Sequence, residues 1–206
     1  MKIKVCGMKS PDNIKEVASL TPDYMGFICY DLSPRFIAAL PSDVLEALPE
    51  SIYKTAVFVN ESVDKIRLLI QQFGFNAVQL HGNESPEFCN ALRDQVTVFK
   101  AFGVDDQFDF SQLDAYMGYV DYFMFDTKTE GHGGSGKTFN WDILNNYHGE
   151  VPFFICGGLS LENIEKVKEI KHPAFYGVDL NSRFETEPGM KNTQQLREAF
   201  TLLRAN

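Results

Sequence analysis

The chain has 206 residues, of which 44% are hydrophobic and 23% are charged, a composition typical of an ordinary globular domain. Its formal net charge of −9 argues against a broad nucleic-acid-binding surface, which needs a basic face. No apolar run approaches the roughly 18 residues of a membrane span, and the first residues lack a signal-peptide pattern. We therefore expect one domain over residues 1–206, with no nucleic-acid or membrane partner.

The chain contains four cysteines, Cys6, Cys29, Cys89 and Cys156. A chain of this length does not need disulfides to hold its core, and no C-x-x-C pair indicates a zinc site. We expect free thiols in a reducing cytoplasm, and no bound metal. Cys89 falls within a helical pattern and reads as a small buried hydrophobe.

Short apolar runs recur along the chain, each four to six residues long. They are nearly continuous rather than alternating, as expected for parallel strands that are covered on both faces. The predicted strands are residues 3–6, 24–29, 54–59, 76–80, 96–101, 121–126, 151–156 and 175–180.

Amphipathic stretches lie between these runs. Ser10 and Pro11 are a plausible start of the first helix, and Gly74 is a plausible end of another. The clearest predicted helices cover residues 11–20, 62–73, 160–171 and 191–204, with another opening at 85–87. Two weaker candidates cover residues 41–48 and 138–147. In the stretch 160–171, the side chains expected to face inward are Leu161, Ile164, Val167 and Ile170.

This alternation predicts an α/β protein, a single-domain (β/α)8 TIM barrel of near-minimal length. The alternative is an open, doubly wound sheet, which concentrates ligand contacts near one switch point. The barrel is favoured because residues that could carry chemistry follow many different strands, and a barrel brings all those strand ends to one mouth. These residues are Cys6, Arg35, His81, Asp126, Gly157, Gly158 and Asp179.

Ring order places Cys6, at the end of the first strand, opposite Asp126, at the end of the sixth. Lys4 is expected to alternate to the other side of its strand or to point along the barrel. The loops between them, after strands seven and eight, are the usual phosphate position of this fold. They contain Gly157-Gly158 and Asn181-Ser182, and a further glycine-rich loop covers residues 133–136.

Several motifs together resemble the phosphoribosylanthranilate isomerases, and they cover nearly the whole chain in that family's order. The most specific are Gln79-Leu80-His81-Gly82 and the block that runs from Asp126-Thr127-Lys128 to Trp141. The others are Lys4-Val5-Cys6-Gly7-Met8, Gly26-Phe27, Ser33-x-Arg35, Gly157-Gly158-Leu159 and Val178-Asp179.

The resemblance implies an intramolecular oxidoreductase of tryptophan biosynthesis. Such enzymes convert N-(5-phosphoribosyl)anthranilate to 1-(2-carboxyphenylamino)-1-deoxyribulose 5-phosphate by general acid–base catalysis, without a cofactor. It further implies a small phosphorylated substrate and a monomer or homodimer. The implied catalytic residues are Cys6 as base and Asp126 as acid. The implied substrate-binding residues are Arg35, His81 and Asp179, and the implied phosphate-binding residues are Gly134, Ser135, Gly136, Gly157, Gly158, Asn181 and Ser182.

The residue types alone leave other readings open. Asp126 could bond to its own turn, Cys6 could be an inert core thiol, and Arg35 could be a surface cation. His81 could be a hydrogen-bonded structural histidine. At the level of function, the alternatives are another phosphosugar isomerase or epimerase, or a non-catalytic barrel that binds a phosphorylated metabolite.

The chain departs from the family pattern at two places. Met8-Lys9 stands where the family commonly has Ile-Thr, and Arg183 stands where a glycine usually approaches the phosphate. Such an arginine could instead contribute a direct positive charge.

Overall fold

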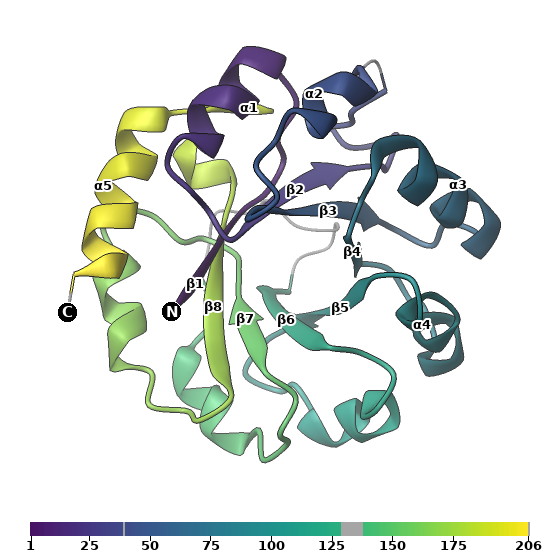
Figure 1. Ribbon diagram of the computed structural model, residues 1–206. Coiled ribbons are helices and arrows are strands. Elements are labelled where there is room, and N and C mark those ends of the chain that lie inside the picture. The colour runs from purple at the N-terminus through teal and green to yellow at the C-terminus, as the bar shows by residue number, and fades with distance from the viewer. Residues whose placement is uncertain (39, 129–137, 206) are drawn as a thin grey trace.

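The structure is a computed structural model that describes residues 1–38, 40–128 and 138–205. Parallel strands follow one another around a closed ring in chain order, and the last strand pairs with the first (Figure 1). The ring consists of β1 (Lys2–Val5), β2 (Tyr24–Ile28), β3 (Tyr53–Phe58), β4 (Ala77–Leu80), β5 (Thr97–Val104), β6 (Tyr122–Thr127), β7 (Phe153–Ile155) and β8 (Phe175–Leu180). The predicted (β/α)8 barrel is confirmed.

Helices surround the ring (Figure 1). The α-helices are α1 (Pro11–Ala18), α2 (Ser42–Glu46), α3 (Val63–Phe73), α4 (Pro86–Arg93) and α5 (Thr193–Arg204). Shorter 3₁₀ segments are η1 (Phe110–Tyr116), η2 (Trp141–Asn146), η3 (Ile164–Glu169) and η4 (Ser182–Phe184). A small antiparallel hairpin, β9 (Glu185–Glu187) and β10 (Met190–Lys191), precedes α5. No helix in these ranges is long and apolar enough to cross a membrane.

The helix boundaries follow local capping chemistry. The side chains of Ser62 and Ser85 accept hydrogen bonds from backbone N–H groups in the first turns of α3 and α4. Gly74 ends α3 in the left-handed conformation, with φ of 62°. Ser10 has the extended backbone of an N-cap, although its side chain makes no capping bond, and Pro11 begins α1 as expected.

Two predicted α-helices are wrong in type. The segments 138–147 and 160–171 contain only the 3₁₀ segments η2 and η3. In the second, the four predicted inward residues are spaced three apart, which matches the three residues per turn of a 3₁₀ helix better than 3.6. Ile164 and Val167 are fully buried, so the inward face was correct although the helix type was not.

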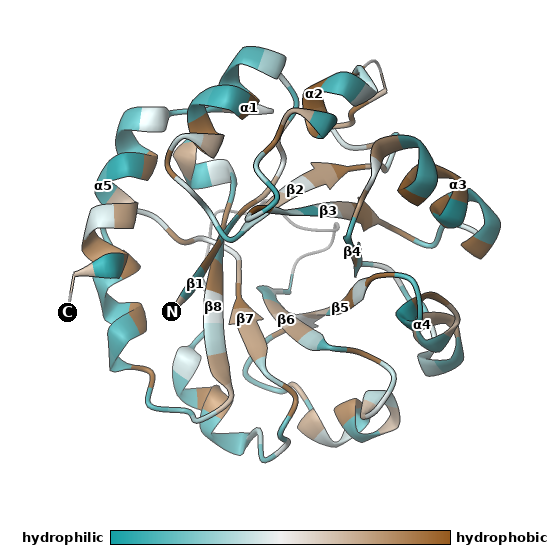
Figure 2. Cartoon of the chain, in the orientation of Figure 1, coloured by the Kyte–Doolittle hydropathy of each residue, from teal (hydrophilic) through white to brown (hydrophobic). Residues whose placement is uncertain are grey.

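Apolar residues dominate the strands, and polar residues cover the outer helices (Figure 2). Alternation along β6 sends Phe123 and Phe125 to the helix layer and Met124 to the barrel interior. Aromatic side chains from strands that are not neighbours pack against one another in the barrel interior. Tyr24 of β2, for example, contacts Phe154 of β7 with a centroid distance of 5.6 Å. These aromatic side chains fill the barrel toward the amino ends of the strands, and the site lies at the carboxyl ends.

Candidate active site

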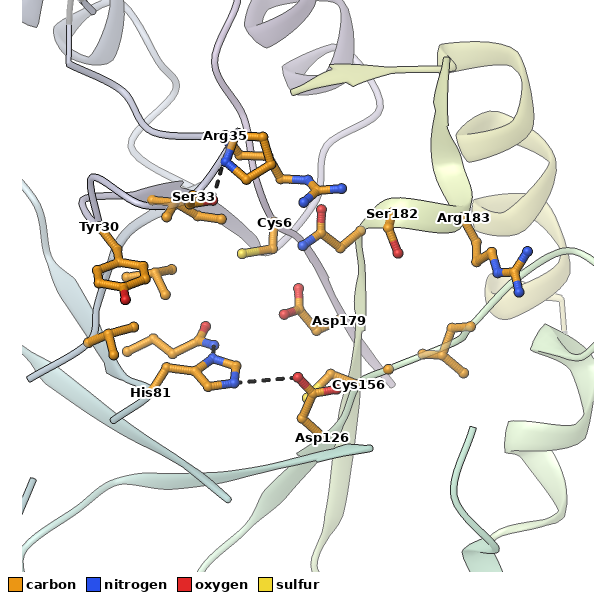
Figure 3. Close-up of a pocket in the computed structure, with 18 of the residues that line it drawn as sticks. Cys6, Tyr30, Ser33, Arg35, His81, Asp126, Cys156, Asp179, Ser182 and Arg183 are labelled. Atoms are coloured by element: carbon orange, nitrogen blue, oxygen red, sulfur yellow. Dashed lines mark hydrogen bonds and ion pairs between the residues drawn. The ribbon is translucent and has the colours of Figure 1, made fainter. Parts of the chain in front are cut away.

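A cavity of about 320 Å³ lies at the carboxyl ends of the strands. It brings together every predicted site residue that the structure describes, from β1 around to β8 (Figure 3). These residues are Cys6, Arg35, His81, Asp126, Gly157, Gly158, Asp179, Asn181 and Ser182. The predicted phosphate-binding residues Gly134, Ser135 and Gly136 lie outside the described residues.

Cys6 directly follows β1, and its backbone N–H donates to the carbonyl of Leu180 at the end of β8 (2.9 Å). The residue is only 3% exposed, yet its sulfur borders the cavity. Burial raises the pKa of the Cys6 thiol, because a thiolate loses solvation there. The positive charges of Lys4 and Lys191 oppose this increase, and the negative charge of Asp179 adds to it.

Of the two directions expected for Lys4, the structure contradicts the first, in which its side chain lies on the other side of the strand from Cys6. Residues two apart on a strand point to the same side, so Lys4 and Cys6 both face the barrel interior. The Lys4 side chain is fully buried, and its Nζ donates to Oδ2 of Asp179 at 2.9 Å. Lys4 therefore lies directly beneath the site and contacts it through Asp179.

Asp126 lies near the end of β6, on the side of the cavity opposite Cys6 (Figure 3). Its Oδ1 accepts a hydrogen bond from the backbone N–H of Thr127 (2.8 Å), as the turn-bonded reading anticipated. Its Oδ2 is 3.4 Å from Nε2 of His81. One carboxyl oxygen is thus fixed by the backbone, while the other meets an ionisable ring.

His81 follows β4, and its Nδ1 lies 3.0 Å from the Nε2 amide of Gln79. With the amide as donor, Nδ1 acts as the acceptor, and the neutral ring carries its proton on Nε2, toward Asp126. A structural role of His81 and a role at the site are therefore compatible, since one ring nitrogen contacts Gln79 and the other faces Asp126.

Arg35 enters the cavity from the loop after β2. Its Nε and Nη2 donate to the carboxylate of Glu185, with distances of 2.6 to 3.0 Å. Glu185 also accepts from Nζ of Lys191 at 2.6 Å. The Arg35 and Lys191 cations, assisted by hydrogen bonds, outweigh burial and lower the pKa of Glu185. Arg35 is not a solvated surface cation, because its side chain is only 14% exposed.

Two glycines in the loop after β7 form another side of the cavity. Gly157 and Gly158 have φ values of 82° and 66°, a conformation that other residues rarely adopt. A Cβ atom on Gly157 would lie 2.5 Å from Oδ1 of Asp126. The missing side chain therefore lets the loop after β7 pass against the carboxylate. Beside it, Asn181 and Ser182 line the cavity together with Arg183.

Asp179 lies between Cys6 and Asp126 in the cavity (Figure 3). Its Oδ2 holds Lys4, whereas its buried Oδ1 has no hydrogen-bond partner among the described residues. Burial raises the pKa of Asp179, and Lys4 opposes this increase. A buried acceptor without a donor is costly, so Oδ1 marks a position where a bound molecule could donate a hydrogen bond.

Sequence reasoning missed Gln79, Glu185 and Lys191 as parts of the site. Strand alternation could have indicated Gln79, two residues before His81, but nothing local indicates that Glu185 pairs with Arg35. Two other thiols, Cys156 and Cys29, also lie near strand ends, and of these Cys156 lines the cavity. Cys29 instead borders a separate cavity beside α3.

The chain is similar over nearly its whole length to proteins of one known family. The family model of N-(5'phosphoribosyl)anthranilate (PRA) isomerase matches residues 3–201. An N-(5'-phosphoribosyl)anthranilate isomerase of Parabacteroides distasonis is 44% identical over 96% of this chain and 90% of its own length. One of Thermotoga neapolitana is 34% identical over 96% of both chains.

Solved structures give the same answer. The phosphoribosyl anthranilate isomerase of Thermus thermophilus superimposes with a TM-score of 0.88, at 26% identity over 98% of both chains. A second isomerase was solved with reduced 1-(o-carboxyphenylamino)-1-deoxyribulose 5-phosphate. It has a TM-score of 0.79, at 25% identity over 98% of this chain and 97% of its own. The chain therefore belongs to the N-(5'-phosphoribosyl)anthranilate isomerase family.

Proposed function

We propose that this chain isomerises N-(5'-phosphoribosyl)anthranilate to 1-(2-carboxyphenylamino)-1-deoxyribulose 5-phosphate, with Cys6 as general base and Asp126 as general acid. The main support is that a thiol and a carboxyl group face one cavity from opposite strands, β1 and β6. The family match indicates the reaction, and the thiol and carboxyl group in the cavity suit its two proton transfers.

The first transfer opens the sugar ring. Asp126 donates a proton to the ring oxygen while the bond between that oxygen and C1 breaks, which leaves an iminium ion between C1 and the anthranilate nitrogen. Oδ2 is the oxygen suited to carry this proton, because Oδ1 already accepts from Thr127. The adjacent Nε2 of His81, 3.4 Å from Oδ2, can bind the carboxylate that remains.

The second transfer moves hydrogen from C2. The iminium ion acidifies the C2 hydrogen, and the Cys6 thiolate takes it to form an enolamine. Ketonisation then places a proton on C1 and removes one from the C2 hydroxyl. The proton count closes if Cys6 returns its proton to C1 and Asp126 receives the hydroxyl proton.

The polar groups of the cavity suit the rest of the substrate. Glu185 holds the Nε–Nη2 edge of Arg35, and the planar guanidinium can bind the anthranilate carboxylate along its other edge. The free Oδ1 of Asp179 suits a hydroxyl of the sugar or the bridging amine. These assignments extend the predicted substrate-binding roles.

The phosphate is assigned to the loops after β7 and β8. Gly157 and Gly158 expose backbone to the cavity, and Asn181 and Ser182 add side-chain donors beside them. Arg183 lines the same cavity, and its guanidinium can supply charge that the family's usual glycine lacks. The predicted contribution of the 133–136 loop is retained as part of this proposal.

We place the reaction in the cytoplasm, since all four cysteines are free and buried. The proposed partners are limited to the substrate and a second copy of the chain, as a monomer or homodimer. Among the solved relatives is one described as a dimeric isomerase from Thermotoga maritima, made monomeric.

The test follows the loss of fluorescence of phosphoribosylated anthranilate with the purified protein. Cys6→Ala and Asp126→Asn should each lower kcat by about 100-fold or more, as expected for general acid–base groups. Cys89→Ala is the matched control, because it removes a buried thiol outside the cavity. Turnover near the wild-type rate in either site variant contradicts that residue's role. No turnover by the wild type would favour a non-catalytic binding barrel.

A further inference from the structure

The barrel interior holds a lysine that the proposed reaction does not use directly. Lys4 lies one side-chain layer below Cys6 on the same face of β1, and none of its side chain is exposed. In the register of β1 with β8 it stands opposite Asp179, to which its Nζ donates at 2.9 Å. A buried ammonium group is costly to maintain, so its location calls for a physical reason.

Gly26 on β2 shows how close this ammonium group is to the catalytic sulfur. A Cβ atom on Gly26 would lie 2.6 Å from Sγ of Cys6 and 3.0 Å from Nζ of Lys4. Both atoms therefore border the small space that the absent side chain leaves. Any larger residue at position 26 would push one of them aside.

We propose that Lys4 is a positioning residue for the general base, and that its buried ammonium group supplies the positive charge beside which the Cys6 thiol ionises. The proposal rests on the proposed function, because it assigns the base to Cys6. Under this proposal the Lys4–Asp179 ion pair contributes to function as well as to stability, because it holds the ammonium group close to Sγ of Cys6.

The charges around Cys6 support this assignment. Lys4 comes from β1, Asp179 from β8, Lys191 from β10, Arg35 from the loop after β2, and Asp126 from β6. His81 and Arg183 line the same cavity, and Cys156 after β7 holds a thiol whose pKa burial raises well above its usual range. Two of the cations, those of Arg35 and Lys191, are shared with Glu185.

Lys4 opposes the effect of burial on the Cys6 pKa more than any other group does. Its own charge persists at neutral pH. Burial would lower the pKa of Lys4, but the Asp179 carboxylate and Cys6 together hold it above its ordinary value. Lys4 therefore keeps its three protons and acts only through its charge, while the proton released by the thiol passes to water in the open cavity.

The experiment measures ionisation of Cys6 without using turnover. The free protein is treated with iodoacetamide between pH 6 and 10, and alkylation of the Cys6 peptide is quantified by mass spectrometry, since only the thiolate reacts. In Lys4→Met, alkylation at pH 7.5 should be about tenfold slower and the profile should move to higher pH. Asp179→Asn removes an anion, so its profile should move to lower pH.

These opposite directions separate a charge effect from distortion. A purely structural role for the pair would shift both variants in the same direction, and this result would overturn the proposal. So would an unchanged profile in Lys4→Met. If that variant does not fold, Asp179→Asn still tests the direction, and Lys4→Met with Asp179→Asn avoids a lone buried carboxylate. The double variant should then react more slowly than Asp179→Asn alone; an equal or faster rate counts against the proposal.

Lys100→Met is the matched control. Lys100 on β5 is also buried and is paired with a buried carboxylate, Glu84, at 3.2 Å, but it points to the helix side of the strand, away from Cys6. Its removal should leave the Cys6 profile unchanged. Failure of the proposed function would look different: alkylation would still shift with Lys4, but Cys6→Ala would keep its turnover.

Discussion

Gly157 allows the loop after β7 to lie directly against the carboxylate of Asp126, the proposed general acid. Any side chain there must displace Oδ1 of Asp126, which a Cβ atom would approach to 2.5 Å, or Oγ1 of Thr127 at 2.6 Å. The residue also has φ of 82°. An alanine would thus combine backbone strain with a shift of the proposed acid.

We predict that Gly157→Ala lowers kcat at least tenfold and lowers the free energy of unfolding by about 1–3 kcal/mol. Gly118→Ala separates the two causes, because Gly118 has φ of 85° but open space around its Cβ position. It should cost about 1 kcal/mol and leave kcat unchanged. Steady-state kinetics and urea unfolding measure both effects. Equal kcat values for the two variants would show that Gly157 does not position Asp126.

The hairpin of β9 and β10 connects Arg35, the proposed anthranilate-binding residue, to the rest of the barrel. Glu185 on β9 binds Arg35, and Lys191 on β10 binds both Glu185 and Asn181. The backbone of Lys191 exchanges hydrogen bonds with the side chain of Asn13 in α1 at 2.7 and 2.9 Å. The direction of Arg35 therefore depends on a hairpin that contacts two other parts of the fold.

The lowered pKa of Glu185 predicts acid sensitivity. Since the folded pKa lies below the unfolded value of 4.5, ionised Glu185 stabilises the fold above pH 4.5, and this contribution is lost as the pH falls toward the folded pKa. Thermal unfolding between pH 6 and pH 3 should therefore show a smaller drop in Tm for Glu185→Gln than for the wild type. The variant should already be less stable at pH 7, because it leaves two cations without a carboxylate, and its KM should rise. Parallel pH curves for the two proteins would contradict this account.

The strands could be predicted because burial on both faces requires short, continuous apolar runs. Helix ends such as Ser85 and Gly74 could be predicted because capping depends only on nearby residues. The 3₁₀ segments η2 and η3 could not, because the choice between helix types depends on how each segment packs on the sheet. At the site, strand ends alone indicated Cys6, His81 and Asp126. The Arg35–Glu185 pair spans 150 positions, so only the folded chain shows it.

The molecule as a whole depends on one closing contact, the seam between β1 and β8. Residues Lys2 to Val5 pair in register with Gly177 to Leu180, and this pairing removes the free edges that an open sheet would have. The same register places Lys4 beside Asp179. Closure of the ring therefore also brings Lys4 and Asp179 together.

Gly177 lies within this seam, opposite Lys2. Its substitution tests how much the β1–β8 pairing contributes to the stability of the whole barrel. A Cβ atom there would lie 2.5 Å from the Lys2 carbonyl oxygen and 2.6 Å from the Phe154 ring. Gly177→Ala should therefore lower the free energy of unfolding by about 1–3 kcal/mol. Gly103→Ala on β5 is the matched control, since its Cβ would meet only an ordinary contact at 3.4 Å, and it should change stability far less.

The single tryptophan reports on another part of the ring. Trp141 in η2 lies in the connection between β6 and β7, outside the β1–β8 pairing. If ring closure stabilises all strands together, urea unfolding followed by Trp141 fluorescence and by far-UV circular dichroism should shift by the same amount in Gly177→Ala. A shift in circular dichroism without one in fluorescence would mean that the seam opens while the β6–β7 side stays folded. In that case the two halves of the site would be stabilised separately, with Cys6 and Lys4 lost before Asp126.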